Sequence, residues 1–352
     1  MSGKNQNFFT KTARFLRGAG FALGMGLAAF GPGHAAKAQQ KTALQVYTTL
    51  LPESLGEFKS AFEAENPDIE IIWRRESTGT LTARIAAEGD NARADAIWGL
   101  AVTSMLDFKK RGLLVAYAPK NLAEIRPSFR DPDAVPSWVG MEAWAAAICF
   151  NTIEAAKLGL PKPTSWFDLH DPRFKGRITF SNPAASGTGY FHVSAWLQIF
   201  GEAKAWDFME KLHPNVAIYE PSGTRPCRHA ATGEFPVGIS YELAGMIEKA
   251  KGGPIEILLM KEGGGWDMDT AAILKGTKNL PQAQRLMDFA ASRKANQLYA
   301  KWVPQVAIEG IGTPPANYPE GVAASMIKND FVWASENRDR IIAEWSRRFE
   351  KK

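Results

Sequence analysis

The feature of this 352-residue chain that most constrains its fold is a regular alternation of short strand-like runs with helical segments. The first three strand-like runs lie at 44–47, 69–73 and 94–98. Between the first two, Leu55, Phe58 and Phe62 recur at helical spacing before an Asn-Pro pair. Strands that alternate with helices build a largely parallel sheet covered by helices. The sequence therefore predicts an α/β lobe at 39–147.

The same pattern resumes further along the chain and predicts a second lobe at 148–253. Its strands are expected at 177–180, 216–219 and 237–241. The apolar run 142–150 has no helix caps and is expected to leave the first lobe, while 255–260 is expected to return. Residues 254–352 would then complete the first lobe and add C-terminal helices. Two such lobes joined by two crossing strands enclose a cleft, and ligands of these sheets bind beyond the carboxyl ends of strands.

The net charge of +5 belongs to the first residues of the chain. Residues 1–38 carry five of the 42 Lys and Arg residues and no acidic residue, which leaves 37 cations against 37 anions elsewhere. Cations followed by an apolar run at 19–30 and an Ala-Lys-Ala site are typical of a secretory signal peptide. A signal anchor is the alternative, but a membrane span needs roughly 20 apolar residues. We therefore expect a periplasmic protein whose neutral body binds neither nucleic acid nor membrane and inserts into no bilayer.

Export also affects the interpretation of the two cysteines, Cys149 and Cys227. An oxidising compartment lets them pair as a single disulfide. Two buried free thiols are the alternative. Without a third cysteine or a Cys-x-x-Cys motif, a redox or zinc role is not expected.

Motifs of enzymes and metal sites do not occur in the sequence. There is no Gly-x-Ser-x-Gly nucleophile elbow, no His-Glu-x-x-His and no phosphate-binding Gly-x-x-x-x-Gly-Lys loop. The histidines after the leader, at 170, 192, 213 and 229, are isolated from one another. The sequence therefore predicts a non-enzymatic protein with no cofactor and no metal.

Two hydroxyl-and-glycine turns stand out, one in each predicted lobe and each at an expected helix start. They are Ser77-Thr78-Gly79-Thr80 and Ser186-Gly187-Thr188-Gly189. A helix N-terminus offers unpaired N–H groups and a partial positive charge, so it can hold an anion without a fixed cation. Each turn could equally be a simple N-cap. Two turns that face each other predict an anion clamp.

Carboxylates and aromatic side chains near the ends of predicted strands offer the opposite charge preference. They are Glu142, Glu242 beside Tyr241, Asp267 beside Trp266, Asp269, Trp98 and Trp144. Carboxylates and aromatic faces together hold an ammonium group. Each of them could also be an ordinary surface or core residue. Combined with the turns, they predict a small ligand that carries both an anion and an amine.

Several longer motifs make a resemblance to a known family specific. They include Glu76-Ser-Thr-Gly79, Ala94-Asp-Ala-Ile-Trp-Gly-Leu-Ala101, Trp138-Val-Gly-Met141, Asn182-Pro-Ala-Ala-Ser-Gly-Thr-Gly189 and Gly265-Trp-Asp-Met268. With them, the chain after the leader resembles the substrate-binding proteins of ABC transporters for 2-aminoethylphosphonate. These are type II periplasmic binding proteins related to ferric-ion binding proteins. The resemblance implies a monomer with an interlobe cleft that delivers a zwitterionic phosphonate to a membrane permease.

The resemblance also implies roles for individual residues. The residues implied to hold the phosphonate are Thr48, Ser77, Thr78, Thr80, Ser186, Gly187 and Thr188. We assign the amine to Glu242, Asp267 and Trp98 on chemical grounds, with Tyr241 next to the site. Ferric-ion relatives use an adjacent tyrosine pair where this chain has Tyr241-Glu242, which argues against iron. Ala185 stands where many relatives have serine.

Other functions remain open from the sequence. The ligand could be a polyamine, phosphate or ferric ion instead. A periplasmic hydrolase of phosphonate or phosphate esters is an alternative of a different class, and a chemoreceptor-coupled sensor is a third.

Overall fold

The first lobe is built from three βα units. The computed structural model describes residues 41–311 and 313–350, and the predicted leader at 1–38 lies outside them. The units are β1 (Thr42–Thr48), α1 (Pro52–Glu65), β2 (Ile69–Arg75), α2 (Thr78–Glu88), β3 (Ala96–Ala101) and α3 (Val102–Lys110), followed by the short β4 (Leu114–Val115). Strand β1 lies between β2 and β3 and pairs in parallel with both, as expected for repeated βα units.

The chain then enters the second lobe through one long strand, β5 (Val139–Asn151). The elements that follow are α4 (Thr152–Lys157), β6 (Ile178–Ser181), α5 (Gly187–Phe200), α6 (Glu202–Leu212), β7 (Val216–Glu220), α7 (Arg225–Thr232), β8 (Val237–Tyr241), α8 (Glu242–Ala250) and β9 (Ile255–Leu258). Here β6 pairs in parallel with β7 and β8.

Strand β10 (Trp266–Leu274) carries the chain back to the first lobe. After it come α9 (Leu280–Ala290), α10 (Arg293–Tyr299), α11 (Val322–Ser325), α12 (Phe331–Glu336) and α13 (Arg338–Phe349). Short 3₁₀ turns lie at Gly89–Asn91, Leu122–Glu124, Pro127–Phe129, Trp166–His170, Pro172–Phe174 and His213–Asn215.

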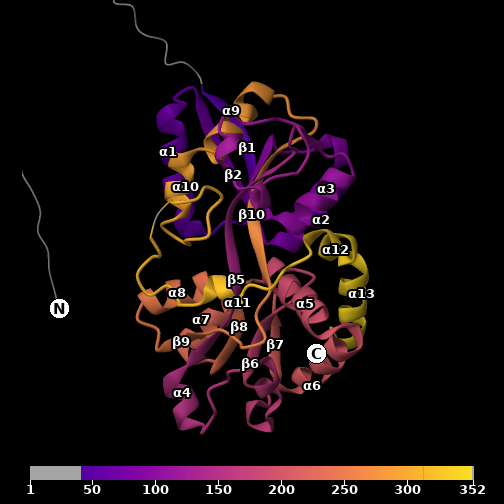
Figure 1. Ribbon diagram of the computed structural model, residues 1–352, viewed down its shortest axis with the longest axis vertical. Coiled ribbons are helices and arrows are strands. Elements are labelled where there is room, and N and C mark those ends of the chain that lie inside the picture. The colour runs from indigo at the N-terminus through magenta and orange to yellow at the C-terminus, as the bar shows by residue number, and fades with distance from the viewer. Residues whose placement is uncertain (1–40, 312, 351–352) are drawn as a thin grey trace, which may run out of the picture. The chain divides into compact units, whose positions relative to one another are not determined.

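Strands β5 and β10 join the two lobes. The strand order is β2-β1-β3-β10-β5-β8-β6-β7, with β4 added at β10 and β9 at β5. The first half of β5 pairs with β10, and its second half pairs with β8 and β9. Figure 1 shows both strands running between the two groups of elements. A strand shared by both lobes in this way is the kind of element about which two-lobed proteins rotate.

Two separate hydrophobic cores fill the lobes. Val139, Met141 and Ala143 of β5 belong to the first core, whereas Ile148 and Phe150 belong to the second.

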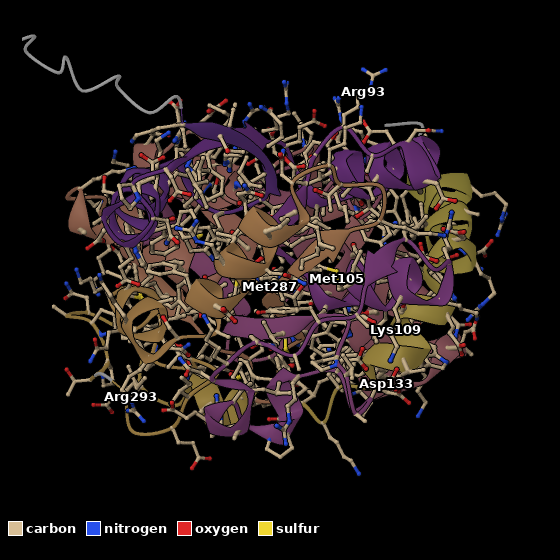
Figure 2. All side chains as sticks on the ribbon, turned by 90° about the horizontal axis from the view of Figure 1, so that it is seen from above. Arg93, Met105, Lys109, Asp133, Met287 and Arg293 are labelled. Atoms are coloured by element: carbon tan, nitrogen blue, oxygen red, sulfur yellow. A yellow bond between two sulfur atoms is a disulfide. The ribbon has the colours of Figure 1, made fainter. Side chains whose placement is uncertain are left out.

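In Figure 2, which views the molecule from the first-lobe end, Met105 of α3 and Met287 of α9 lie inside the molecule. Arg93 and Arg293 stand at its periphery, and Lys109 forms an ion pair with Asp133 at 2.8 Å.

The C-terminal part of the chain differs from the expectation that 254–352 completes the first lobe. Strand β9 pairs with the second half of β5, so it belongs to the second lobe. Ile341, Trp345 and Phe349 of α13 are buried in the second core, where Trp345 packs edge-on against Tyr219. The chain therefore crosses between the lobes a third time, after Phe331, which still packs against the first core. This crossing was missed because an amphipathic helix at a chain end does not reveal which sheet it covers.

No helix within 41–311 and 313–350 is long and apolar enough to cross a membrane.

Candidate ligand-binding cleft

A cavity of about 170 Å³ lies where the two lobes meet the crossing strands. The first lobe contributes Thr49, Leu50, Leu51, Ser54, Phe58, Arg75, Glu76, Ser77, Thr78, Trp302 and Val303. The crossing strands contribute Glu142, Trp144 and Asp269, and the second lobe adds Ser186, Gly187, Thr188, Ser222, Gly223, Thr224, Tyr241 and Leu243. Both halves of the molecule therefore wall the same space.

The two turns singled out from the sequence touch each other across this cleft. The N–H of Gly79 donates a hydrogen bond to the carbonyl of Ala185 at 3.0 Å. A Cβ atom placed on Gly187 would lie 2.7 Å from Oγ1 of Thr78. The lobes are thus closed on each other at the turns, and only glycine allows this approach.

Each turn begins a helix. Ser186 is the N-cap of α5, and its Oγ accepts from the N–H of Gly189 at 3.5 Å. Ser77 occupies the N-cap position of α2 without a side-chain cap, and its Oγ lies 3.1 Å from Oγ1 of Thr80. Thr80 is exposed and does not line the cavity, so it supports Ser77 rather than facing the ligand space. Ser77, Thr78, Ser186, Gly187, Thr188 and Tyr241 do line it.

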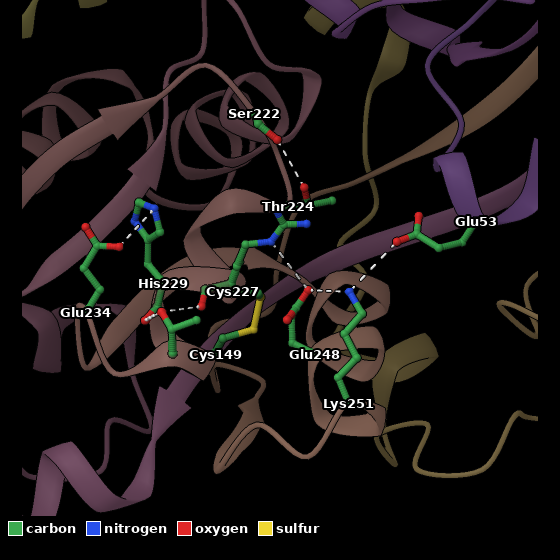
Figure 3. A network of polar contacts seen from close by, with 11 residues as sticks. Glu53, Cys149, Ser222, Thr224, Cys227, His229, Glu234, Glu248 and Lys251 are labelled. Carbon is green, nitrogen blue, oxygen red and sulfur yellow. Dashed lines mark hydrogen bonds and ion pairs between the residues drawn. A yellow bond between two sulfur atoms is a disulfide. The ribbon is translucent and has the colours of Figure 1, made fainter. Parts of the chain in front are cut away.

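A third hydroxyl-and-glycine turn, Ser222-Gly223-Thr224, was missed from the sequence. It follows β7 and precedes α7, and Oγ of Ser222 lies 3.1 Å from Oγ1 of Thr224 (Figure 3). A Cβ on Gly223 would lie 2.2 Å from Oγ1 of Thr188, so this turn packs directly on the second one. The signal was present, because the letters Ser-Gly-Thr repeat those of 186–188 after another strand.

Arg75 gives the cavity wall a cation that the sequence analysis did not place. It is the last residue of β2, immediately before the first turn, and its Nε donates to the carbonyl of Leu50 at 2.5 Å. This contact holds the guanidinium beside the cavity while its other N–H groups stay available. A basic residue at a strand end next to a hydroxyl turn was the signal that could have identified it.

Two buried carboxylates, Glu142 and Asp269, face the cavity from the crossing strands. The pairing of β5 and β10 shifts register between Met268 and Thr270, which sets Asp269 against both Met141 and Glu142. Such a bulge re-aims side chains near functional sites. Burial is the main cause that raises the pKa of Asp269 to about 7 and the pKa of Glu142 well above its ordinary value. The negative charge of Asp269 adds to the rise at Glu142.

Two predicted amine ligands, Glu242 and Asp267, are occupied elsewhere and do not line the cavity. Oε2 of Glu242 accepts from the N–H of Ala145 at 2.7 Å. Oδ1 of Asp267 accepts from the N–H of Val102 at 3.0 Å, and Oδ2 accepts from the hydroxyl of Thr103 at 2.8 Å. Burial raises the pKa of both carboxyls to about 7, but these hydrogen bonds give them structural roles. The assignment of the amine to them is corrected accordingly.

Trp98 and Thr48 also lie outside the cavity lining. Trp98 is fully buried in the first core, where it stacks on Phe58 and donates from Nε1 to the hydroxyl of Tyr299 at 2.8 Å. Thr48 is fully buried, and its Oγ1 accepts from the N–H of Leu50 at 3.1 Å. Both residues shape the wall from behind and neither reaches the ligand space.

The disulfide between Cys149 and Cys227 is present in the second lobe. It ties α7 to the crossing strand β5 beneath the third turn (Figure 3). The same figure shows Lys251, the residue after α8, between Glu248, at 3.0 Å, and Glu53 of α1, at 3.9 Å. The Glu53 contact is a second link between the lobes, at a distance that gives a weak exposed ion pair.

Beyond pairs, the acidic, cysteine and histidine side chains of the described residues are spread apart. Among the described residues, no group of three or more His, Cys, Asp and Glu side chains is placed to hold a metal ion. Tyr241 lines the cavity, but Glu242 next to it turns towards the backbone of Ala145.

Comparisons with known proteins agree on the class of protein. A family model described as bacterial extracellular solute-binding protein matches residues 94–331. An uncharacterized protein of Haemophilus influenzae is 32% identical over 290 residues, 80% of this chain and 83% of that protein. A spermidine/putrescine-binding periplasmic protein of Escherichia coli is 28% identical over 164 residues, 44% of this chain and 43% of that protein.

Solved structures agree on the fold. The periplasmic binding protein AfuA from Actinobacillus pleuropneumoniae, with exogenous fructose-6-phosphate bound, superposes with a TM-score of 0.82 at 31% identity. That match covers 89% of this chain and 100% of AfuA. Iron-bound HitA from Pseudomonas aeruginosa superposes with a TM-score of 0.73 at 21% identity, over 86% of this chain and 99% of HitA. The fold is the two-lobed type II periplasmic binding protein fold that the sequence predicted, and the chain belongs to the bacterial extracellular solute-binding protein family.

Proposed function

We propose that this solute-binding protein binds 2-aminoethylphosphonate in the interlobe cavity and delivers it to the permease of an ABC importer. Its family and its structural relatives are solute-binding proteins rather than enzymes, which supports a non-enzymatic role. In this proposal the leader exports the chain to the periplasm, and the protein meets its ligand there as a monomer.

The observation that carries the proposal is the convergence of three hydroxyl turns and one guanidinium on a single cavity. Ser77 and Thr78 come from the first lobe, while Ser186, Thr188 and the turn at 222–224 come from the second. Helices α2 and α5 begin at the first two turns and direct the positive ends of their dipoles towards them. Arg75 adds a charge-assisted donor. Donors arriving from several directions suit the oxygens of a tetrahedral anion.

Closure of the lobes follows from the same geometry. The donors for the anion are split between the lobes, so a ligand held by one lobe attracts the other. Rotation about β5 and β10 brings Gly79 to Ala185 and closes the turns around the anion. Binding free energy is thereby used to select the closed conformation that a permease can recognise.

The ligands named for several relatives carry one or other of the two charged groups of the proposed ligand. The bound fructose-6-phosphate of AfuA is a phosphorylated solute in a chain of the same fold. The polyamine-binding relative takes cationic amines, and a further relative from Pseudomonas aeruginosa is a γ-aminobutyric acid-binding protein. A phosphonate with a primary amine combines these two chemistries. A sugar phosphate is the second candidate, because the buried carboxylates could accept hydrogen bonds from sugar hydroxyls.

A thermal-shift screen followed by calorimetry tests the proposal. We expect 2-aminoethylphosphonate to raise the melting temperature through preferential binding to the folded state. Putrescine, inorganic phosphate and ferric citrate should give small shifts. Combining Ser77→Ala with Thr188→Ala should abolish binding and leave the melting temperature of the free protein nearly unchanged. Thr232→Ala, an exposed hydroxyl at the far end of α7, is the matched control. No shift with any phosphonate or phosphate ester contradicts the proposal.

A further inference from the structure

We propose that Glu142 and Asp269 form a subsite for a primary ammonium group, so that the cleft selects oxyanions that also carry a cation and discriminates against sugar phosphates, which carry no cationic group. The inference rests on the proposed function, since it takes the cavity as the ligand site. It replaces Glu242, Asp267 and Trp98 with two residues whose side chains face that cavity.

The geometry of the two carboxylates points to a missing partner. Glu142 is 7% exposed and Asp269 is 8% exposed, and both line the cavity. Oε2 of Glu142 and Oδ1 of Asp269 are buried and have no hydrogen-bond partner in the described part of the chain. Buried carboxylate oxygens are expensive to leave unpaired, and native structures seldom do so without a functional reason. A ligand group that donates hydrogen bonds would satisfy both oxygens.

The charges around the pair call for a cation. Asp267, Tyr241 and Tyr299 interact electrostatically with the pair, and an ionised form of any of them is an anion. The guanidinium of Arg75 lines the same cavity, but its Nε is bonded to the carbonyl of Leu50. Burial raises the pKa of Asp269, while the indole of Trp144 and the hydroxyl of Thr49 act to lower it, and Oδ1 stays unpaired among the described residues. Two neighbouring carboxyls without a counter-ion cannot both ionise easily. An ammonium group supplies the missing positive charge and up to three N–H donors.

Aromatic side chains complete the proposed subsite. Trp144 lines the cavity beside Glu142, and its ring lies 5.5 Å from that of Tyr241 and 5.0 Å from that of Phe191. An aromatic wall next to carboxylates favours an organic cation over a hydrated metal ion, because ring faces attract ammonium groups and the apolar carbons attached to them.

An ammonium group is favoured over sugar hydroxyls for an electrostatic reason. A hydroxyl can donate one hydrogen bond to a carboxylate but leaves its charge uncompensated in a buried site. An ammonium group donates and neutralises at once, and such charge-assisted bonds are about twice as strong as neutral ones. The subsite should therefore distinguish an amine from a hydroxyl at the same position of otherwise identical ligands.

Glu142 and Asp269 lie on the crossing strands, whereas the turns lie in the lobes, so we assign the two parts of the site different roles in binding. Strands β5 and β10 connect the lobes, whereas the first turn lies in one lobe and the other two turns lie in the other. The ammonium group would be held at the crossing strands first, and the lobes would then close on the oxyanion. Ligands without the cation should bind with fewer contacts and lower affinity.

Calorimetry with a matched ligand series tests the inference. The probes are 2-aminoethylphosphonate, 2-hydroxyethylphosphonate, ethylphosphonate and fructose-6-phosphate. We expect the unmodified protein to bind the amine at least roughly 100-fold more tightly than the hydroxyl analogue. Glu142→Gln and Asp269→Asn should each reduce this preference at least about tenfold and leave the affinity for ethylphosphonate within about threefold. Asp207→Asn, on the exposed surface of α6, is the matched control.

The outcomes separate this inference from the proposed function. Equal binding of the amine and hydroxyl ligands, or tighter binding of fructose-6-phosphate, overturns the ammonium subsite and leaves an oxyanion-binding protein. Unchanged amine preference in both amide variants also overturns it. Failure of every phosphonate and phosphate ester to bind overturns the proposed function itself. If an amide variant does not fold, the ligand series on the unmodified protein still decides the question.

Discussion

The N–H of Gly79 in the first turn of α2 donates a hydrogen bond to the carbonyl of Ala185, the residue before the N-cap of α5, at 3.0 Å. This bond joins the backbones of the two lobes directly. It places two helix N-termini side by side at one wall of the cavity, where their dipoles repel each other unless an anion lies between them. An anion bound between the two N-termini, as proposed above, would stabilise the closed arrangement.

Gly79→Ala should prevent this closure. The added Cβ would lie 2.1 Å from the carbonyl oxygen of Ala184, a backbone atom that cannot move aside. We expect at least a roughly 100-fold loss of ligand affinity and no ligand-induced decrease in radius of gyration by small-angle scattering. The free protein should be as stable as before or slightly more so, because alanine is a better helix former than glycine. Gly56→Ala in α1, where no atom lies within 4 Å of the added Cβ, is the control and should bind normally.

Arg75→Ala should weaken the oxyanion end of the site. The substitution removes the guanidinium that lines the cavity, so 2-aminoethylphosphonate and ethylphosphonate should both lose affinity by about 10- to 100-fold. Its neighbour Arg74 donates to Gln45 on the exposed side of the sheet, and Arg74→Ala should have little effect. Calorimetric titration of both variants checks this, and a loss confined to the amine ligand would argue against the assignment of Arg75 to the anion.

The affinity for the amine ligand should rise with pH between about 5.5 and 8. Burial raises the pKa of Asp269 to about 7 and that of Glu142 above its ordinary value, so these groups hold protons at the acidic end of this range. An ammonium ligand binds the ionised form, and protons are released on binding. The phosphonate also titrates in this range, so ethylphosphonate measured in parallel corrects for it. Parallel pH profiles for the two ligands would show that the carboxylates do not take part.

The same carboxylates should lower the stability of the ligand-free protein at neutral pH. A carboxyl whose pKa is raised in the folded state binds more protons there than in the unfolded chain, so its contribution becomes unfavourable as pH rises from about 4 through 7. Combining Glu142→Gln with Asp269→Asn should raise the free energy of unfolding at pH 8 by a few kcal/mol. Urea unfolding at pH 8 and pH 4.5 measures this, and the gain should shrink at the lower pH. An equal gain at both values would point to packing instead.

Loss of the disulfide should lower stability without changing ligand selectivity. Cys149 and Cys227 are 78 residues apart in sequence, and closing such a loop stabilises the folded state by about 4 kcal/mol in the chain-entropy treatment. Neither cysteine lines the cavity. Cys149→Ala combined with Cys227→Ala should lower the melting temperature and keep the order of ligand affinities. A reductant should have the same effect on the unmodified protein and none on the double variant.

The local parts of the site could be predicted from the sequence because their signals are local. A strand followed by hydroxyl and glycine residues at a helix start identified 77–80 and 186–189, and the structure brings these turns together. The turn at 222–224 carries the same signal and was overlooked. Arg75 was missed because cations were sought inside the turns and not at the strand end before them.

The carboxylates could not be assigned in the same way. In a regular strand Asp267 and Asp269 would point to one face. The register shifts in β10 instead leave Asp267 at the start of α3 and Asp269 at the cavity, and no sequence pattern reveals a bulge. Trp98 was misplaced for a related reason, since every residue of β3 is buried and alternation then cannot distinguish a core face from a ligand face.

The third crossing between the lobes affects the order in which the two hydrophobic cores can be completed. Phe331 packs against the first core, whereas Ala334, Ile341, Trp345 and Phe349 complete the second core. Synthesis proceeds from the N-terminus, and domains generally fold as units in that direction. The second lobe therefore cannot complete its core until α13 has been synthesised. Until then the second lobe exposes the apolar surface that α13 later covers, so it is expected to reach its folded state after the first lobe.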